Sequence, residues 1–586
     1  MLGILTANII KKEDVFMNTL VIVLIAVVVL GLGYVLYGRR IAKKWGIDPK
    51  AETPAVKYND GKDYVPTNGW TVFSHQFSSI AGAGPVTGAI QAAVFGWLPV
   101  LLWILIGGVF FGAVTDFGAL YASVKNQGKS MGMLIEKYIG KLGRKLFLLF
   151  CWLFSLLIIA VFADMVSGTF TAFDAVSGAK LATASTNGSA GMVSIMFMLF
   201  AVVFGLIQKK FNFSGWKEFV LGVVFIVVSF AIGMKVPIIL GKDGWSYIVF
   251  AYIFIAAIMP IWLMKQPRDY MTTIMFVCMI VGAALGLIIG HPTMNLPVFT
   301  GFKNEQLGTM FPILFVTVAC GAVSGFHSLV SSGTSSKTIA NEKDMLKVGY
   351  GAMILESVLA VLALCVAGAA AKNGIPAEGT PFQIFSRGVA GFFEKMGLSV
   401  HFSTVFMTMC VSALALTTLD AVARIGRMSF QELFSVDDMK NAKPWRKLLC
   451  NTYFSTIFTL ACGFVLTKIG YQTIWPLFGS ANQLLSALVL ITLCVFLKVT
   501  GRSNKMLFPP MIIMLCVTFT ALIQRVVGLV KSLVAGQEIF ASVIQLVVAV
   551  LLITLALIIA VNSFKSYVRS KKGSEVEETE KTIVNE

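Results

Sequence analysis

Long apolar runs separated by short polar stretches extend over nearly the whole chain. A helix needs roughly 20 residues to cross about 30 Å of hydrocarbon, so the pattern predicts about 15 membrane-spanning helices. The expected spans are 18–38, 72–94, 97–124, 146–170, 190–208, 217–237, 246–264, 271–290, 310–334, 347–371, 399–423, 448–468, 473–497, 507–531 and 539–563. The polar stretches between them are too short for a soluble core. The pattern therefore predicts an all-α polytopic membrane protein.

Two of these segments, 72–94 and 310–334, are interrupted by small residues. The runs at 81–88 and 319–325 share an Ala…Val-(Thr/Ser)-Gly pattern. Unwound backbone is tolerated at membrane depth only where it lines a cavity or is buried in protein. We therefore expect two broken helices at matching places in two halves of the chain. Chance similarity between small-residue segments that serve close helix packing is the alternative.

The basic residues indicate how the chain crosses the membrane. The formal charge is +18, but Lys and Arg form short clusters between apolar segments, which argues against a nucleic-acid partner. With the N-terminus outside, 35 of the 47 Lys and Arg residues fall on the cytoplasmic side, so the positive-inside rule places the C-terminus inside. The two interrupted segments then run in opposite directions, as an inverted-topology repeat requires.

This topology gives an expected division of the chain. It comprises a non-native or disordered extension at 1–16, a first transmembrane helix within 17–45, a first repeat at 72–290, a second, inverted repeat at 310–563 and a polar cytoplasmic tail at 564–586. The extension is set apart because Met17 opens the first apolar helix.

Three carboxyl groups are candidates for proton or ion coupling, because a charged carboxylate in hydrocarbon is costly and is retained for function. Asp116 and Glu356 lie in the helices that follow the two interrupted segments, and Asp420 lies in a later one. Burial favours the neutral carboxyl, which suits a group that takes up and releases a proton. The alternative is a structural ion pair, for example Asp420 with Arg424 one turn later.

Candidates for substrate binding gather near the interruptions. Free N–H groups and hydroxyls at the start of a half-helix bind carboxylates, whereas unwound carbonyl groups suit cations. The candidates are Gly82, Gly84, Thr87, Ser324, His327, Ser328, His75, Asn482 and Gln483. Each has a structural alternative, because hydroxyls bond back to their own helix, histidines fill packed sites, and amides tie helices together.

The sequence argues against other classes of function. It has neither a Walker-type phosphate loop nor an H-E-x-x-H or G-x-S-x-G motif, which counts against a primary pump and against the corresponding enzymes. The nine cysteines have no zinc-binding spacing, so neither a metal nor a cofactor is expected. A channel remains an alternative, and a nutrient sensor is disfavoured because no signalling domain is present.

Several stretches carry a family resemblance. They are IAGAGP at 80–85, GAVTDF at 112–117, the run 319–337, TTLD at 417–420 and ANQ at 481–483. In these, and over roughly residues 17–565, the chain resembles the carbon starvation protein A family of bacterial inner-membrane transporters.

The resemblance implies uptake of short peptides or pyruvate when nutrients run short. It also implies a fold similar to the amino acid–polyamine–organocation (LeuT-like) superfamily, whose core is an inverted repeat of five helices with a broken first helix in each half. Together with the buried carboxyls, this predicts a secondary active transporter that uses proton symport, with sodium coupling as the nearest alternative. The sequence leaves the oligomeric state open.

Overall fold

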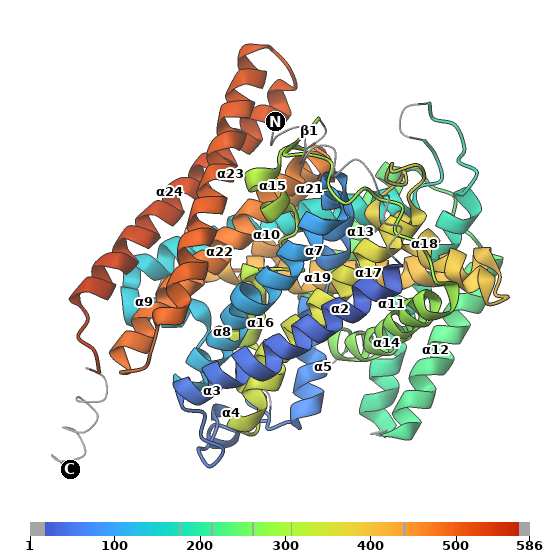
Figure 1. Cartoon of the computed structure of the whole chain (residues 1–586). Coiled ribbons are helices and arrows are strands. Elements are labelled where there is room, and N and C mark those ends of the chain that lie inside the picture. Colours follow the sequence, from blue (N-terminus) through green and yellow to red (C-terminus); the bar gives the residue numbers. More distant parts are fainter. Residues whose placement is uncertain are drawn as a thin grey trace.

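The computed structural model describes residues 18–61, 63–174, 177–211, 215–260, 263–305, 307–436 and 441–573. The chain is almost entirely helical (Figure 1). In the described residues the only sheet is an antiparallel pair, β1 (Lys303–Asn304) and β2 (Gly308–Thr309). The expected extension at 1–16 and the end of the tail lie outside the described residues.

Eleven helices of the described chain are long and apolar enough to cross a membrane. They are α2 (Thr19–Leu32) continued by α3 (Arg39–Trp45), α7 (Trp97–Gly107) continued by α8 (Ala113–Lys125), α10 (Lys141–Phe170), α11 (Ala184–Phe211), α12 (Trp216–Lys235), α14 (Lys265–Gly290), α17 (Ala352–Ala370), α19 (Val400–Phe434), α22 (Tyr471–Val499), α23 (Phe508–Val534) and α24 (Ile539–Arg569). Each corresponds to one expected span, and together they make this a multi-span membrane protein.

The other four expected spans correspond to shorter or interrupted helices. They are α13 (Lys242–Ile258), α21 (Thr452–Thr467), the pair α5 (Gly69–Ile80) and α6 (Gly84–Ala92), and the pair α15 (Met310–Thr317) and α16 (Gly325–Gly333). Both predicted interruptions are therefore confirmed, one between α5 and α6 and one between α15 and α16.

Short helices complete the chain between these elements. They are α4 (Pro54–Lys57), α9 (Met131–Ile139), α18 (Pro381–Lys395) and α20 (Pro444–Leu449), with single 3-10 turns at Ala93–Phe95, Ser335–Lys337, Glu342–Asp344 and Lys505–Leu507. A Thr380–Gln383 capping box begins α18, which packs against α19.

After each interruption, a π-helical turn leads into a helix that carries a candidate carboxyl. Gly108–Gly112 leads into α8 and Leu346–Gly351 leads into α17, while a third π turn, Gly33–Gly38, joins α2 to α3. The Tyr350 hydroxyl of the second turn donates to the Val109 carbonyl of the first, at 2.8 Å. A π turn holds one extra residue and often occurs at functional sites. Both of the linked turns adjoin helices that carry a candidate carboxyl.

The two interruptions pack directly against each other at the centre of the molecule. A Cβ atom added to Gly84 would lie 2.5 Å from the Cys320 sulfur, so only glycine allows this approach. Small residues bring helices into such contact inside membrane proteins. From this crossing α16 continues between α8 and α22 (Figure 1).

Candidate functional site

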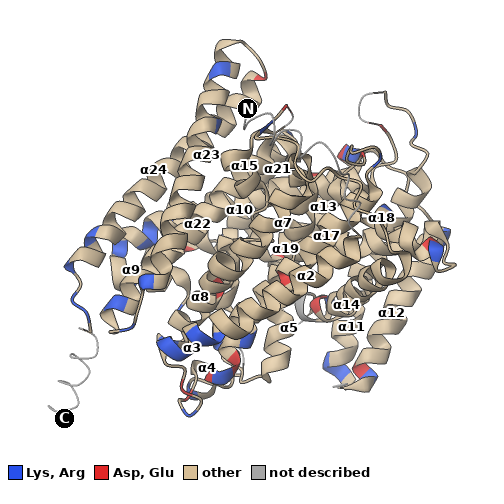
Figure 2. Ribbon diagram, in the orientation of Figure 1, with Lys and Arg blue, Asp and Glu red and all other residues tan. Residues whose placement is uncertain are grey.

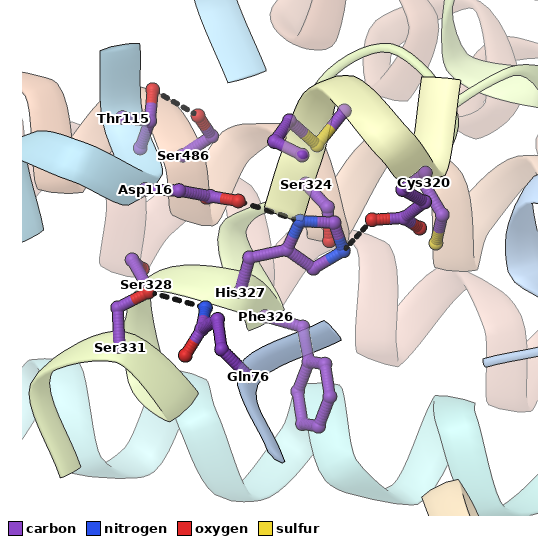
Figure 3. A network of polar contacts seen from close by, with 12 residues as sticks. Gln76, Thr115, Asp116, Cys320, Ser324, Phe326, His327, Ser328, Ser331 and Ser486 are labelled. Carbon is purple, nitrogen blue, oxygen red and sulfur yellow. Dashed lines mark hydrogen bonds and ion pairs between the residues drawn. The ribbon is translucent and has the colours of Figure 1, made fainter. Parts of the chain in front are cut away.

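Three titratable side chains from three different helices meet beside the interruptions. His327 of α16 lies between Asp116 of α8 and Glu356 of α17. Its Nδ1 is 3.0 Å from Asp116 Oδ2, and its Nε2 is 3.4 Å from Glu356 Oε2 (Figure 3). All three side chains are at most 1% exposed. We call this group the buried triad.

The positions of the two carboxyls follow from the π turns. Asp116 is four residues beyond Gly112, where the first turn ends, and Glu356 is five residues beyond Gly351, where the second ends. Because the two turns are bonded to each other, the helices that leave them are close together, and both carboxyls reach the histidine that α16 places between them.

Several polar atoms of the buried triad have no hydrogen-bond partner among the described residues. These are Asp116 Oδ1, His327 Nε2 and both Glu356 carboxyl oxygens. Within the described chain, neither carboxyl forms an ion pair with Lys or Arg. Buried charges without partners are costly. The arrangement therefore disfavours ionisation of both carboxyls at once, and it has the groups needed to hold and release a proton.

A small cavity lies between the two interruptions. Its lining includes Gly82, Gly84, Cys320, His327 and Asn482, and its volume is about 20 Å³. A space of this size holds roughly one water molecule. The interruptions therefore enclose a closed site in this conformation, and a larger molecule enters only if they separate.

Asn482 of α22 binds the start of the half-helix α16. Its side-chain oxygen accepts hydrogen bonds from Ser324 Oγ and from the backbone N–H groups of Gly325 and Phe326, each at 3.1 Å. The neighbouring Gln483 donates to the Phe315 carbonyl at 2.7 Å. In this conformation both amides tie helices together, the structural alternative that the sequence left open.

The other two hydroxyl candidates, Thr87 and Ser328, bond back to the backbone of their own helices. Thr87 Oγ1 donates to the Ala83 carbonyl at 2.8 Å, and Ser328 Oγ donates to the Gly325 carbonyl at 2.5 Å. His75 is exposed on α5 and lies apart from the buried triad. Neither hydroxyl donates to the triad in this conformation.

Asp420 belongs to a separate buried cluster. Its carboxyl receives both terminal nitrogens of Arg268, at 2.5 and 3.3 Å, and both side chains are fully buried. The expected alternative partner, Arg424, instead donates to the carbonyl groups of Ala256 and Met259. An arginine stays charged in proteins, so Asp420 is the direct partner of a buried cation.

Sequence reasoning missed two residues that the structure places near the candidates. Arg268 lies in the polar stretch KQPRD at 265–269, which precedes an apolar segment and gave no indication of the contact with Asp420. Gln76 of α5 donates to Ser331 Oγ at 2.8 Å (Figure 3). It also accepts from Ser335 Oγ at 2.6 Å. It thereby joins the first broken helix to the serine-rich end of the second, but a single Gln in an apolar segment gave no indication of this contact.

Comparisons with known proteins support a common family. The model of the family described as Carbon starvation protein CstA matches residues 18–375 and 369–521. The peptide transporter CstA of Escherichia coli (strain K12) is 31% identical over 559 residues, which cover 82% of this chain and 77% of that protein. The pyruvate/proton symporter BtsT of the same strain is 31% identical over 603 residues, covering 86% and 81%.

A solved structure also aligns with most of the chain. It is a manganese transporter of Eremococcus coleocola, 12% identical, and the alignment covers 87% of this chain and 99% of that one with a TM-score of 0.44.

Proposed function

The chain belongs to the carbon starvation protein CstA family, and on this premise we propose that it imports pyruvate or short peptides by proton symport. It is a secondary transporter and not an enzyme. The names of the two relatives support both substrate classes, and one of them names the proton as the coupling ion. The observation that carries the coupling is the buried triad of Asp116, His327 and Glu356.

Proton coupling follows from the charge of the buried triad. With Glu356 protonated, the site holds one charged pair, Asp116 with His327, and has no net charge. Loss of one proton leaves a net negative charge in a buried site where, among the residues that the structure describes, no Lys or Arg is paired with either carboxyl. This charge is stabilised where the site becomes hydrated. Protonation therefore favours the closed conformation, and proton release favours an open one.

Asp420 has a different role in this proposal. Its ion pair with Arg268 links α14 to α19 within the protein interior. Because both of its carboxyl oxygens accept hydrogen bonds from Arg268, Asp420 positions helices in this proposal and is not the proton carrier.

The central substrate site lies at the 20 Å³ cavity between the interruptions. The start of α6 lines this cavity through Gly84, whereas the start of α16 is already occupied by Asn482. Helix N-termini stabilise anions. We place the substrate carboxylate at the start of α6, with Gly82, His327 and Asn482 nearby, and the interruptions separate to admit it.

The proposed topology is that of an inverted repeat with 15 spans, in a bacterial inner membrane. Lys and Arg gather around α3, α9 and the C-terminal end of α24 (Figure 2), and this supports a cytoplasmic location for that side. In each half, a broken helix is followed by a helix with a buried carboxyl, Asp116 in 72–290 and Glu356 in 310–563. This correspondence supports a LeuT-like repeat, with the N-terminus outside and the C-terminus inside.

Uptake into proteoliposomes tests the proposal. The purified chain is given radiolabelled pyruvate or dialanine, with an inward proton gradient and no sodium. We expect accumulation of one substrate against its gradient, which a protonophore abolishes. Glu432→Gln is a suitable control, because this exposed carboxyl pairs with Arg144 and belongs neither to the buried triad nor to the lining of the cavity between the interruptions.

Three results would contradict parts of the proposal. Accumulation that needs sodium would show that sodium, and not the proton, is the coupling ion. Equilibration without accumulation would indicate a channel. Uptake of neither substrate would reject the proposed substrates.

A further inference from the structure

A second, larger cavity lies between the ends of α10, α11, α13, α18, α19 and α22. Its volume is about 440 Å³, and its lining includes the cations Lys242 and Arg387, the carboxyl groups of Asp164, Asp174 and Glu378, and Thr380 and Tyr471. Pockets that bind small molecules have roughly this size. In the proposed topology these helix ends face the outside, so we call it the outer cavity.

Lys242 is held at the wall of the outer cavity by an ion pair. Its ammonium nitrogen lies 2.7 Å from Asp164 Oδ1, while Asp164 Oδ2 accepts the Tyr471 backbone N–H at 2.9 Å. The Asp164 side chain is 5% exposed, whereas that of Lys242 is 44% exposed. An ammonium has three N–H donors. Asp164 is therefore fixed and satisfied, and Lys242 retains donors for a ligand in the cavity that it lines.

Arg387 places a second cation on the same cavity. Its Nε donates to the Gln383 carbonyl at 3.2 Å, and its Nη2 donates to the Glu378 carbonyl. In the part of the chain that the structure describes, Arg387 forms no ion pair with a carboxylate. A guanidinium whose charge is not paired suits two-point binding of a carboxylate.

Three aromatic side chains lie between the outer cavity and the interruptions. Phe162, two residues before Asp164, and Phe478, seven residues after Tyr471, both line the 20 Å³ cavity. Trp475 contacts both rings, with centroid distances of 6.4 Å to Phe162 and 5.1 Å to Phe478. All three are at most 3% exposed. Because α10 and α22 line both cavities, this aromatic cluster separates them in the closed conformation.

We propose that the outer cavity is a binding site for the carboxylate group of an incoming substrate, with Lys242 and Arg387 as its ligands. Substrate remains bound there until the aromatic cluster of Phe162, Trp475 and Phe478 opens toward the interruptions. The outward orientation and the carboxylate substrate rest on the proposed function. Both proposed substrates carry a carboxylate, pyruvate as its main polar group and a peptide at its C-terminus.

Equilibrium binding of radiolabelled pyruvate and dialanine to the purified full chain in detergent tests this site. Lys242→Gln removes the cation but keeps a polar side chain, which is one bond shorter than that of lysine. We expect its Kd for the bound ligand to rise roughly fivefold to tenfold, as for the loss of one partly exposed charge-assisted hydrogen bond. Arg387→Gln should act in the same direction, and Lys242→Arg should restore binding.

Lys468→Gln is a closely matched control. Lys468 is also 44% exposed and also pairs with a carboxylate, Asp243, at 2.7 Å, but it does not line the outer cavity. Its removal should leave Kd unchanged. His327→Ala, which disrupts the buried triad, should also retain the outer binding.

Each opposite outcome overturns the site. Equal affinity of Lys242→Gln and Lys468→Gln for the ligand would reject it. Loss of binding in His327→Ala with binding retained in Lys242→Gln would also reject it, and so would the absence of binding to the unmodified chain. The binding assay uses no proton gradient. Lys242-dependent binding in a protein that shows no proton-driven uptake would therefore retain the outer site while rejecting the symport.

Discussion

Asp116 Oδ2 and His327 Nδ1 lie 3.0 Å apart, although 211 positions separate the two residues along the chain. Asp116 belongs to the helix that follows the first interruption, and His327 belongs to the second broken helix. Their contact joins the two halves of the chain at a titratable pair. A change in its protonation therefore acts on the packing between the halves.

His327→Gln should separate proton coupling from substrate movement. The amide keeps a polar group between the carboxyls but cannot carry the proton. We expect accumulation driven by a proton gradient to fall roughly tenfold or more, because general loss of a proton-transfer group has at least that effect. Exchange of labelled for unlabelled substrate at equal pH should persist. Gradient-driven accumulation at the normal level would remove His327 from the coupling mechanism.

Glu356→Gln replaces a carboxyl that we infer to be neutral in the closed conformation with a neutral side chain of similar shape. The thermal midpoint of unfolding should therefore stay the same or rise, because replacing buried ionisable groups is often neutral or stabilising. Proton-driven uptake should be lost. A clear fall in thermal stability would indicate instead that Glu356 is charged and paired in the closed form.

Proton symport predicts the direction in which the rate of uptake changes with external pH. Closure over the bound substrate requires protonation of the buried triad from outside, so the initial rate of uptake should fall as the external pH rises at constant internal pH. Glu356→Gln, measured by exchange at equal pH on both sides, should show a weaker pH dependence than the unmodified chain. An unmodified rate that rises with external pH would contradict symport.

Arg268→Met should destabilise the protein strongly. It leaves Asp420 charged and unpaired in a fully buried position, which costs about 3–5 kcal/mol in comparable cases. The double variant Arg268→Met with Asp420→Leu should recover part of this loss, because the buried Arg268–Asp420 pair is removed and only Asp269, which also pairs with Arg268 at 2.6 Å, is left without that partner. Thermal unfolding in detergent measures both. If Arg268→Met unfolds at the normal temperature, the pair is not a stabilising link between α14 and α19.

Asn482→Leu should destabilise the start of α16. It leaves two backbone N–H groups without the acceptor that they have now, and each such buried donor costs about 1–3 kcal/mol. Asn482→Asp retains an acceptor at the positive end of the helix and should be less harmful. Gln483→Leu is the matched control for the loss of one amide on the same helix. Equal stability of Asn482→Leu and the unmodified chain would reject this role.

The sequence predicted the elements of the site better than their contacts. Runs of small residues indicated the positions of both interruptions, because glycine weakens a helix locally and small side chains let neighbouring segments approach closely. The carboxyls were recognisable because charge is rare at membrane depth. The partners were not, because Arg268 and Asp420 are 152 residues apart and no local pattern encodes such a meeting. The role of Asn482 at the start of α16 depends on tertiary packing in the same way.

The π turns had no sequence signal that we recognised, yet they determine what the two carboxyl-bearing helices can do. A π turn contains one residue more than an α turn, so relaxing it rotates the following segment by about 100° and moves it by about 1.5 Å. Such a step in α8 would take Asp116 away from His327 without unfolding the helix. Because Tyr350 bonds the two turns together, α8 and α17 would change register as a pair. The one extra residue in each π turn is what makes such a step possible.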